Sequence, residues 1–124
     1  MTALIAVALL GGLGAATRFV VDGAIRSRWT HVLPVATIVV NVSGSLAIGL
    51  VAGAASFHGL PPDWRLAAAT GFCGGYTTFS TAMVETVRLA QAGELRHATV
   101  NVLGTLVLTC GAAALGVAVM AALA

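Results

Sequence analysis

Four long apolar runs fill most of this chain and leave no stretch in which a water-soluble core could form. They lie at about residues 3–22, 34–57, 66–88 and 98–120, and short loops separate them. Crossing the hydrocarbon core of a bilayer takes roughly 20 apolar residues in a helix. Of the 124 residues, 59% are hydrophobic and only 8% are charged. The sequence therefore predicts an all-α, multi-pass protein of the cell (inner) membrane with four transmembrane helices and no soluble domain.

The same composition excludes several classes of function. Lysine is absent and the formal net charge is +2, so no basic stripe exists that could bind nucleic acid. The chain shows no paired nucleophile and base and no metal-ligating cluster, so we do not expect an enzyme. Cys73 and Cys110 lie in apolar runs and are expected to be small buried hydrophobes. The first run lacks a basic start and an Ala-x-Ala cleavage site, which favours a retained span over a signal peptide.

The third run contains a segment that a helix accommodates poorly. Residues 71–81 read Gly-Phe-Cys-Gly-Gly-Tyr-Thr-Thr-Phe-Ser-Thr. Glycine costs about 1 kcal/mol relative to alanine inside a helix, and β-branched residues lose rotamer freedom there. We therefore expect the third helix to break near Gly74. Irregular backbone at bilayer depth must be buried by protein or lined by water, and its freed carbonyls and amides can face ions. A glycine-rich packing seam is the alternative interpretation.

Polar side chains in the first two runs are further candidates. Asn41 lies deep in the second run, and its amide must be satisfied by a neighbouring helix or by a passing ligand. Arg18 ends the uncharged part of the first run, either as a snorkelling arginine or as part of an anion-attracting vestibule. Asp22, four residues later, could pair with Arg18 on the same helix face. Glycines in the first run predict close approach of another helix; they are Gly11, Gly12 and Gly14.

The end of the third run and the fourth run also carry polar groups. Glu85 is the only acid inside a run beyond the break, and counting along the helix places it about 15 Å from the break, where an exposed carboxylate near the headgroups is expected. Asn101, Thr105 and Thr109 follow one another at a spacing of four, which puts them on one helix face. Threonine hydroxyls often bond to their own helix, so this polar track allows a structural or a functional interpretation.

Three ordered motifs resemble the Fluc (CrcB-type) fluoride channels. They are Gly-Gly-x-Gly-Ala-x-x-Arg at 11–18, Val-Asn-Val-x-Gly-Ser at 40–45, and the broken segment at 71–81 with Glu85 behind it. The resemblance covers nearly the whole chain. It implies a fluoride-selective passive channel that lowers cytoplasmic fluoride. The channel would be an antiparallel, dual-topology dimer with two narrow pores at the subunit interface and a central structural sodium ion.

The resemblance also implies roles for individual residues. Backbone carbonyls at the positions of Gly74 and Thr77, one pair from each subunit, would hold the sodium ion. The pore would be lined by an asparagine and two phenylalanines three residues apart, and this chain has Asn41 and Phe79 but Ala82 at the second aromatic position. Aromatic edges can coordinate a small anion without a full charge that would trap it. The remaining implied positions are Ser80, Thr105 and Thr109 in the pore and Arg18 in a vestibule.

The distribution of arginines indicates whether the second subunit of the dimer is an identical or a related chain. Arg65 is the only arginine in the second loop, whereas four arginines flank the first and third loops: Arg26, Arg28, Arg88 and Arg96. The positive-inside rule places those two loops in the cytoplasm and both termini outside. Such a bias, together with Ala82, predicts one half of a heterodimer with a related chain of opposite orientation, while an identical partner stays possible.

Two other functions are alternatives. One is a structural or regulatory subunit of a heterodimeric channel, with an impaired pore of its own because Ala82 replaces an aromatic ring. The other is a small multidrug exporter, which needs a membrane-embedded glutamate in the first span, and the first run has none. The sequence therefore favours the channel.

Overall fold

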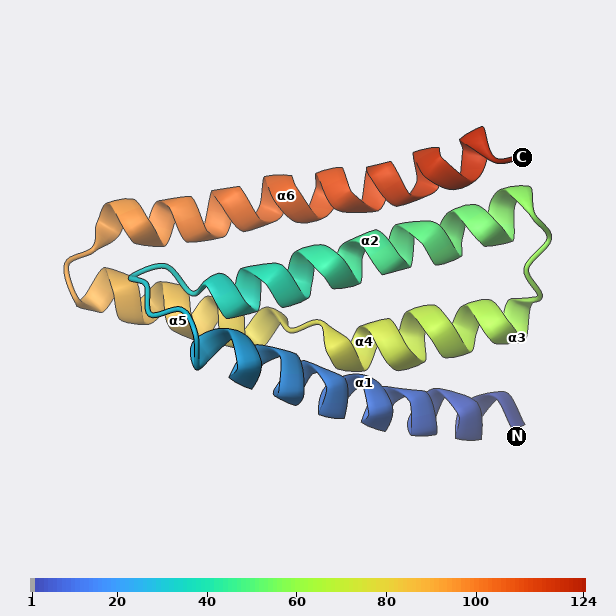
Figure 1. Cartoon of the computed structure of the whole chain (residues 1–124), viewed down its shortest axis with the longest axis horizontal. Helices are drawn as coiled ribbons and strands as arrows, with labels where there is room; N and C mark the ends of the chain where they lie inside the picture. Colours follow the sequence, from blue (N-terminus) through green and yellow to red (C-terminus); the bar gives the residue numbers. More distant parts are fainter. Residues whose placement is uncertain (1) are drawn as a thin grey trace.

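The computed structural model describes residues 2–124, which form four antiparallel helical passes and no strand (Figure 1). Three passes are single helices: α1 (Thr2–Arg26), α2 (Val35–Phe57) and α6 (Leu95–Ala122). The third pass is divided into α3 (Pro62–Arg65), the π-helical η1 (Leu66–Cys73), α4 (Gly74–Tyr76) and α5 (Phe79–Gln91). Both ends of the chain lie at one end of the bundle with the α2–α3 loop, and the other two loops lie at the opposite end. The predicted all-α fold with a broken third helix is confirmed.

Three of the passes are each long and apolar enough to cross a membrane: α1, α2 and α6. The third pass is divided by its break into shorter helices. The distribution of side chains also fits a bilayer, because large apolar residues such as Leu9, Phe19 and Val107 are exposed, whereas the buried hydrophobic positions are mostly alanines. The chain is therefore a multi-pass membrane protein, whose outer surface faces lipid or other protein.

The break lies three residues beyond the expected position. Gly74 has helical dihedral angles (φ −63°, ψ −38°), and the chain becomes extended only at Thr77 (φ −79°, ψ 160°) and Thr78 (φ −147°, ψ 121°). At Gly75, α1 packs directly on the helical backbone, because a Cβ atom there would overlap the carbonyl of Gly11. The β-branched threonines adopt the extended conformation instead, and the Thr78 hydroxyl then caps α5 by accepting a bond from the N–H of Thr81 (3.3 Å).

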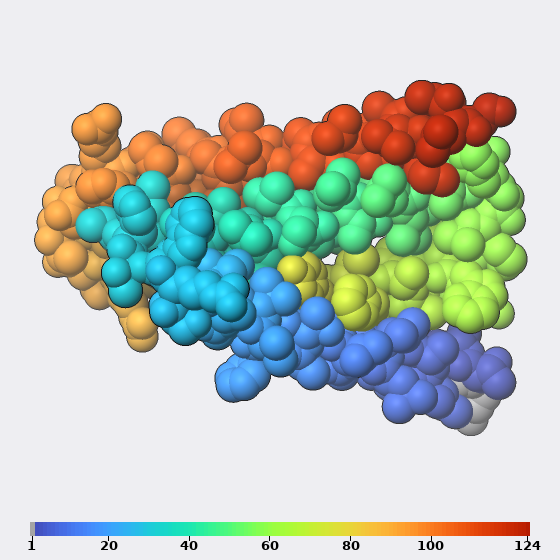
Figure 2. All heavy atoms as spheres, viewed as in Figure 1, coloured from blue at the N-terminus to red at the C-terminus, as the bar shows by residue number. Residues whose placement is uncertain are grey.

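Close backbone contacts hold the bundle together as two pairs, α2 with α6 and α1 with η1 and α4. In Figure 2, α6 lies along α2 at one edge of the molecule and α1 forms the opposite edge. Gly14 packs on the carbonyl of Phe72, and Gly49 packs on the carbonyl of Ala113, so neither position has room for a side chain. At Gly12, by contrast, a Cβ atom would have no neighbour within 4 Å. Small residues thus allow the close helix approach that membrane bundles use.

The two cysteines differ in environment. Cys73 is buried, as expected. Cys110 is exposed on α6, so the prediction of a buried position was wrong for it. The reason is that an apolar run in a membrane helix turns one face outward toward lipid or another subunit, and composition alone does not identify that face.

Candidate functional site

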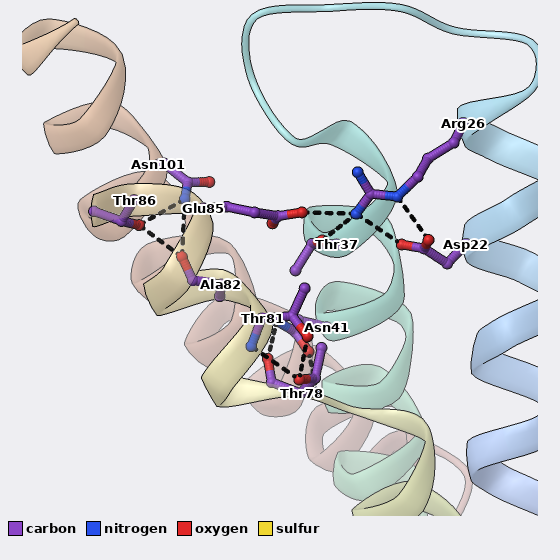
Figure 3. Close-up of polar contacts among 10 residues, drawn as sticks. All are labelled: Asp22, Arg26, Thr37, Asn41, Thr78, Thr81, Ala82, Glu85, Thr86 and Asn101. Carbon is purple, nitrogen blue, oxygen red and sulfur yellow. Dashed lines mark hydrogen bonds and ion pairs between the residues drawn. The ribbon is translucent and has the colours of Figure 1, made fainter. Parts of the chain in front are cut away.

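The broken backbone of the third pass is held by the side chain of Asn41 (Figure 3). Asn41 Nδ2 donates to the carbonyl of Thr78 (2.8 Å), and the N–H of Thr78 donates to Asn41 Oδ1 (2.8 Å). Both residues are buried. The amide therefore satisfies the N–H that the break releases, which hydrocarbon could not do, and adds a bond to the carbonyl at the start of α5. A primary amide has a second N–H, and that of Asn41 has no partner within residues 2–124.

Within the described residues, the break also leaves the backbone carbonyls of residues 74–77 without their usual helical partners, those of Gly74 and Thr77 among them. In a continuous helix, the N–H of Thr78 would donate to the carbonyl of Gly74, and the N–H of Thr81 would donate to that of Thr77. Side chains divert both donors, because Thr78 donates to Asn41 Oδ1 and Thr81 to the hydroxyl of Thr78. The carbonyls of Gly74 and Thr77 are the two that the family resemblance nominates as sodium ligands. Neutral carbonyl oxygens suit a small monovalent cation.

A cavity of about 530 Å³ adjoins the break, and we call it the central cavity. Its wall comes from α2, the break, α5 and α6, and it contains four predicted pore residues: Asn41, Phe79, Thr105 and Thr109. Ala82 lies in the same wall, where a second aromatic ring would otherwise stand. Ser80 is not among the lining residues and is exposed on α5. The structure thus brings four of the five predicted pore residues together.

The polar track on α6 divides into groups with different environments. Asn101 is fully buried, and its Nδ2 donates to the hydroxyl of Thr86 (2.8 Å), which holds α5 against α6 (Figure 3). The hydroxyl of Thr109 donates to the carbonyl of Thr105 (2.8 Å), so it bonds to its own helix. The hydroxyl oxygen of Thr105 is buried and has no partner among the described residues. Thr105 is therefore the track residue whose hydroxyl is free to bind a ligand at the cavity wall.

Arg18 lies in a second cavity of about 300 Å³ between α1, α2 and α5, here called the α1-side cavity. Thr78 lines both this cavity and the central cavity, so the break forms the wall between them. Across the described part of the chain, Arg18 makes no ion pair, and Asp22 pairs instead with Arg26 (2.6 Å). The expected pairing of Arg18 with Asp22 was wrong, because Arg26 is four residues from Asp22 in the other direction.

The environment of Glu85 also differs from the expectation. Its side chain is 14% exposed and accepts a hydrogen bond from Arg26 (2.7 Å). The predicted exposed carboxylate near the headgroups was therefore wrong. The reason is tertiary: the end of α1 reaches across the bundle to α5, which the spacing of residues in one helix cannot indicate. Sequence reasoning likewise missed Thr78 as the partner of Asn41, although a threonine directly before an amphipathic helix is a usual capping signal.

The fold and these cavities define a small membrane transport protein, built around a discontinuous helix whose break is lined by amide, hydroxyl and aromatic groups. Residues 5–117 match the family described as CrcB-like protein, Camphor Resistance (CrcB), and the chain belongs to this family. Its relatives include the Fluoride-specific ion channel FluC 1 of Leifsonia xyli subsp. xyli (strain CTCB07), which is 52% identical over 91% of this chain and 82% of the relative. The Fluoride-specific ion channel FluC 2 of Cutibacterium acnes (strain DSM 16379 / KPA171202) is 45% identical over 90% of this chain and 92% of the relative. The resemblance inferred from the motifs is confirmed.

Proposed function

We propose that this chain forms a fluoride-selective passive channel that lowers cytoplasmic fluoride. The observation that carries the proposal is the central cavity, where neutral hydrogen-bond donors and an aromatic ring meet: the second N–H of Asn41, the unpartnered hydroxyl of Thr105 and Phe79. These groups can replace part of the hydration shell of a small anion, and none carries a full charge that would hold it permanently. Membership of the CrcB-like family and relatives named fluoride-specific ion channels support this assignment.

A passive pore is sufficient for this task. Fluoride enters cells as neutral HF, ionises in the more alkaline cytoplasm and cannot return through the lipid. A selective pore then lets the anion leave down its gradient. The sequence contains no phosphate-cradling loop that would supply energy from a nucleotide. We therefore assign no pump or enzyme activity to the chain.

The conducting unit is proposed to be an antiparallel dimer with two pores at the subunit interface. In the single chain the ring of Phe79 is 78% exposed although it lines the central cavity. A second subunit would cover this ring and close the open side of the cavity. The partner would be an identical chain or a related chain in the opposite orientation, and the arginine asymmetry of the loops favours the related chain.

Fluoride efflux from liposomes tests the proposed function. The purified chain, alone and together with a related chain of opposite arginine bias, is reconstituted into liposomes loaded with potassium fluoride, and valinomycin carries the counter-ion. We expect rapid fluoride release, measured with a fluoride electrode, and much slower chloride release from matched liposomes. Fluoride release no faster than from protein-free liposomes, in both preparations, would contradict the proposal.

A central structural sodium ion is proposed as part of the same dimer, held by the carbonyls of Gly74 and Thr77 from each subunit. The support is that side chains divert the helical partners of both carbonyls. A ligand that binds only the folded state at about 100 times its dissociation constant stabilises it by about 2.7 kcal/mol. We expect replacement of sodium by N-methyl-D-glucamine to lower the thermal midpoint of the purified dimer and its fluoride efflux. An unchanged midpoint in sodium-free buffer would count against the ion.

Removing a single hydroxyl tests the role of α6. Thr105→Val keeps the shape of the side chain but removes the unpartnered hydroxyl, so we expect fluoride efflux to fall about tenfold, the equivalent of one neutral hydrogen bond in the pathway. Stability should not fall, because a buried hydroxyl without a partner is itself unfavourable. Thr109→Val is the matched control: its hydroxyl already bonds to the carbonyl of Thr105, so a smaller decrease is expected. Equal effects of the two variants on efflux would contradict this distinction.

A structural or regulatory subunit is the second candidate, favoured by Ala82 in the cavity wall, where one aromatic ring is missing. Such a subunit would support flux through pore residues of its partner. Its own cavity residues could then be replaced without loss of flux, provided that the dimer still assembled. The Asn41→Asp variant described in the Discussion separates this candidate from the channel.

A further inference from the structure

Arg26, the last residue of α1, joins three helices through its side chain (Figure 3). Its Nε and Nη2 donate to the two carboxylate oxygens of Asp22 on α1 (2.6 and 3.1 Å). Nη2 also donates to Glu85 Oε1 on α5 (2.7 Å) and to the hydroxyl of Thr37 on α2 (3.2 Å). One guanidinium therefore serves two carboxylates that come from different passes of the bundle.

The same residue lies where three cavities meet. Arg26 lines the α1-side cavity that contains Arg18. It also lines two cavities of about 280 and 270 Å³ next to the α1–α2 loop, both of which include His31 and Pro34 and which we call the loop-side cavities. Among the described residues, Arg26 is the one that lines all three. An anion that moves from the loop-side cavities toward Arg18 along this part of the bundle would therefore pass the Arg26 cluster.

The cluster of Asp22, Glu85 and Arg26 would be more negative without Arg26. Asp22 and Glu85 contribute two negative charges, and Arg26 contributes the positive charge bonded to both. Glu85 is mostly buried, and its second oxygen, Oε2, is buried without a hydrogen-bond partner in the described chain. A carboxylate that is withdrawn from water and loses its counter-charge produces a strong local negative potential. Such a potential at a passage for anions would oppose entry.

We propose that Arg26 reduces the negative charge at an anion entrance: its guanidinium offsets one of the two negative charges of Asp22 and Glu85, so that fluoride can pass from the loop-side cavities into the α1-side cavity. This inference rests on the proposed channel function. It assigns Arg26 a role distinct from that of Arg18, because Arg26 is occupied by carboxylates and acts by lowering their net negative charge. The formal charge of the three residues is −1 in the native chain. It would be −2 in Arg26→Gln, −1 in the double variant Arg26→Gln/Glu85→Gln, and 0 in Glu85→Gln.

The test is a charge series measured by fluoride efflux from liposomes. If the charge of the entrance controls access, efflux should follow it: Glu85→Gln at or above the native rate, the double variant near the native rate, and Arg26→Gln lower by about tenfold at low ionic strength. Added impermeant salt should restore part of the Arg26→Gln rate, because it screens exposed charges. Arg28→Gln is the matched control, since Arg28 is exposed at the same end of the bundle and forms no ion pair within residues 2–124.

If Arg26 acted only as a structural bridge between helices, the efflux rates of the variants would follow a different pattern. Glu85→Gln and the double variant both lack the Arg26–Glu85 ion pair, so both should then lose activity together with thermal stability, and salt should not restore it. That pattern, or unchanged efflux in Arg26→Gln, would overturn the inference. If Arg26→Gln does not fold, the comparison of the double variant with Glu85→Gln still separates charge compensation from a structural bridge. Neither of these two variants contains a Glu85 charge that lacks its counter-charge. Failure of the native chain to conduct would instead refute the proposed function.

Discussion

Fluoride efflux is expected to disappear when Asn41 is replaced by leucine, and the folded state is expected to lose about 1–3 kcal/mol of stability. Leucine has a similar shape, but it leaves the N–H of Thr78 without its partner and removes the bond from Asn41 to the Thr78 carbonyl, which as the N-cap carbonyl of α5 also accepts within that helix. Each buried, unsatisfied group costs about 1–3 kcal/mol. The thermal midpoint of the detergent-solubilised protein measures the loss of stability, and liposome efflux measures the loss of function.

Asn41→Asp separates the pore role of this residue from its structural role. A protonated aspartic acid can accept from the N–H of Thr78 and donate to its carbonyl, so the geometry of the break is kept. It lacks the second N–H that the amide offers to the central cavity, and if it ionises it adds a charge that repels fluoride. We expect a folded protein whose efflux falls at least about tenfold. A folded Asn41→Asp variant with native efflux would favour the structural subunit. Ser45→Ala, which alters the same cavity wall one turn away, is the control.

The sequence predicts the four passes well because the bilayer imposes a simple length requirement that each apolar run meets. It predicts the break less accurately. Intrinsic propensities count Gly74 and Gly75 as poor helix residues, but α1 packs on this segment so closely that only glycine fits at Gly75. The threonines that follow adopt the extended conformation. A local propensity therefore indicated that a break occurs, and a tertiary contact determined where.

The candidate site was predictable in its members but not in its connections. The motif resemblance nominated five pore residues, of which Ser80 lies outside the central cavity and four line it: Asn41, Phe79, Thr105 and Thr109. Helical spacing placed Asn101 with the threonines on one face, yet Asn101 is bonded to Thr86 on α5. Periodicity shows which side of a helix a residue occupies, but it cannot name the partner on the neighbouring helix.

The charged cluster shows the same limit more clearly. Asp22 has an arginine four residues away on either side, Arg18 and Arg26, so helix geometry alone allows two ion pairs. Arg26 also reaches Glu85, which is 59 residues away in the chain. A guanidinium with several donors can bond both carboxylates at once. The arrangement is therefore set by the tertiary structure, which brings Arg26 on α1 within hydrogen-bond distance of Glu85 on α5.

A methyl group added at Gly14 is expected to prevent α1 from packing in its native position. The Cβ of Gly14→Ala would overlap the carbonyl of Phe72 and approach the N–H of Tyr76 to 2.9 Å, and both are backbone atoms that cannot rotate away. Overpacking of this kind costs about 1–3 kcal/mol or more, whereas alanine gains only about 1 kcal/mol over glycine in helix propensity. The steric term therefore exceeds the propensity term, and the thermal midpoint should fall.

Gly12→Ala separates the steric term from the propensity term. It makes the same change two residues away on the same helix, where nothing lies within 4 Å of the added carbon. Only the propensity gain remains there, so Gly12→Ala should be neutral or slightly stabilising within the single chain. The two variants should also differ in function. Phe72 and Tyr76 flank Gly74, so a displaced α1 would move one of the proposed sodium ligands, and Gly14→Ala should lose fluoride efflux and its stabilisation by sodium together. Gly14→Ala with native stability and efflux would show that α1 can move away from η1 and α4 at little cost, and the close packing of these helices would then not fix the break.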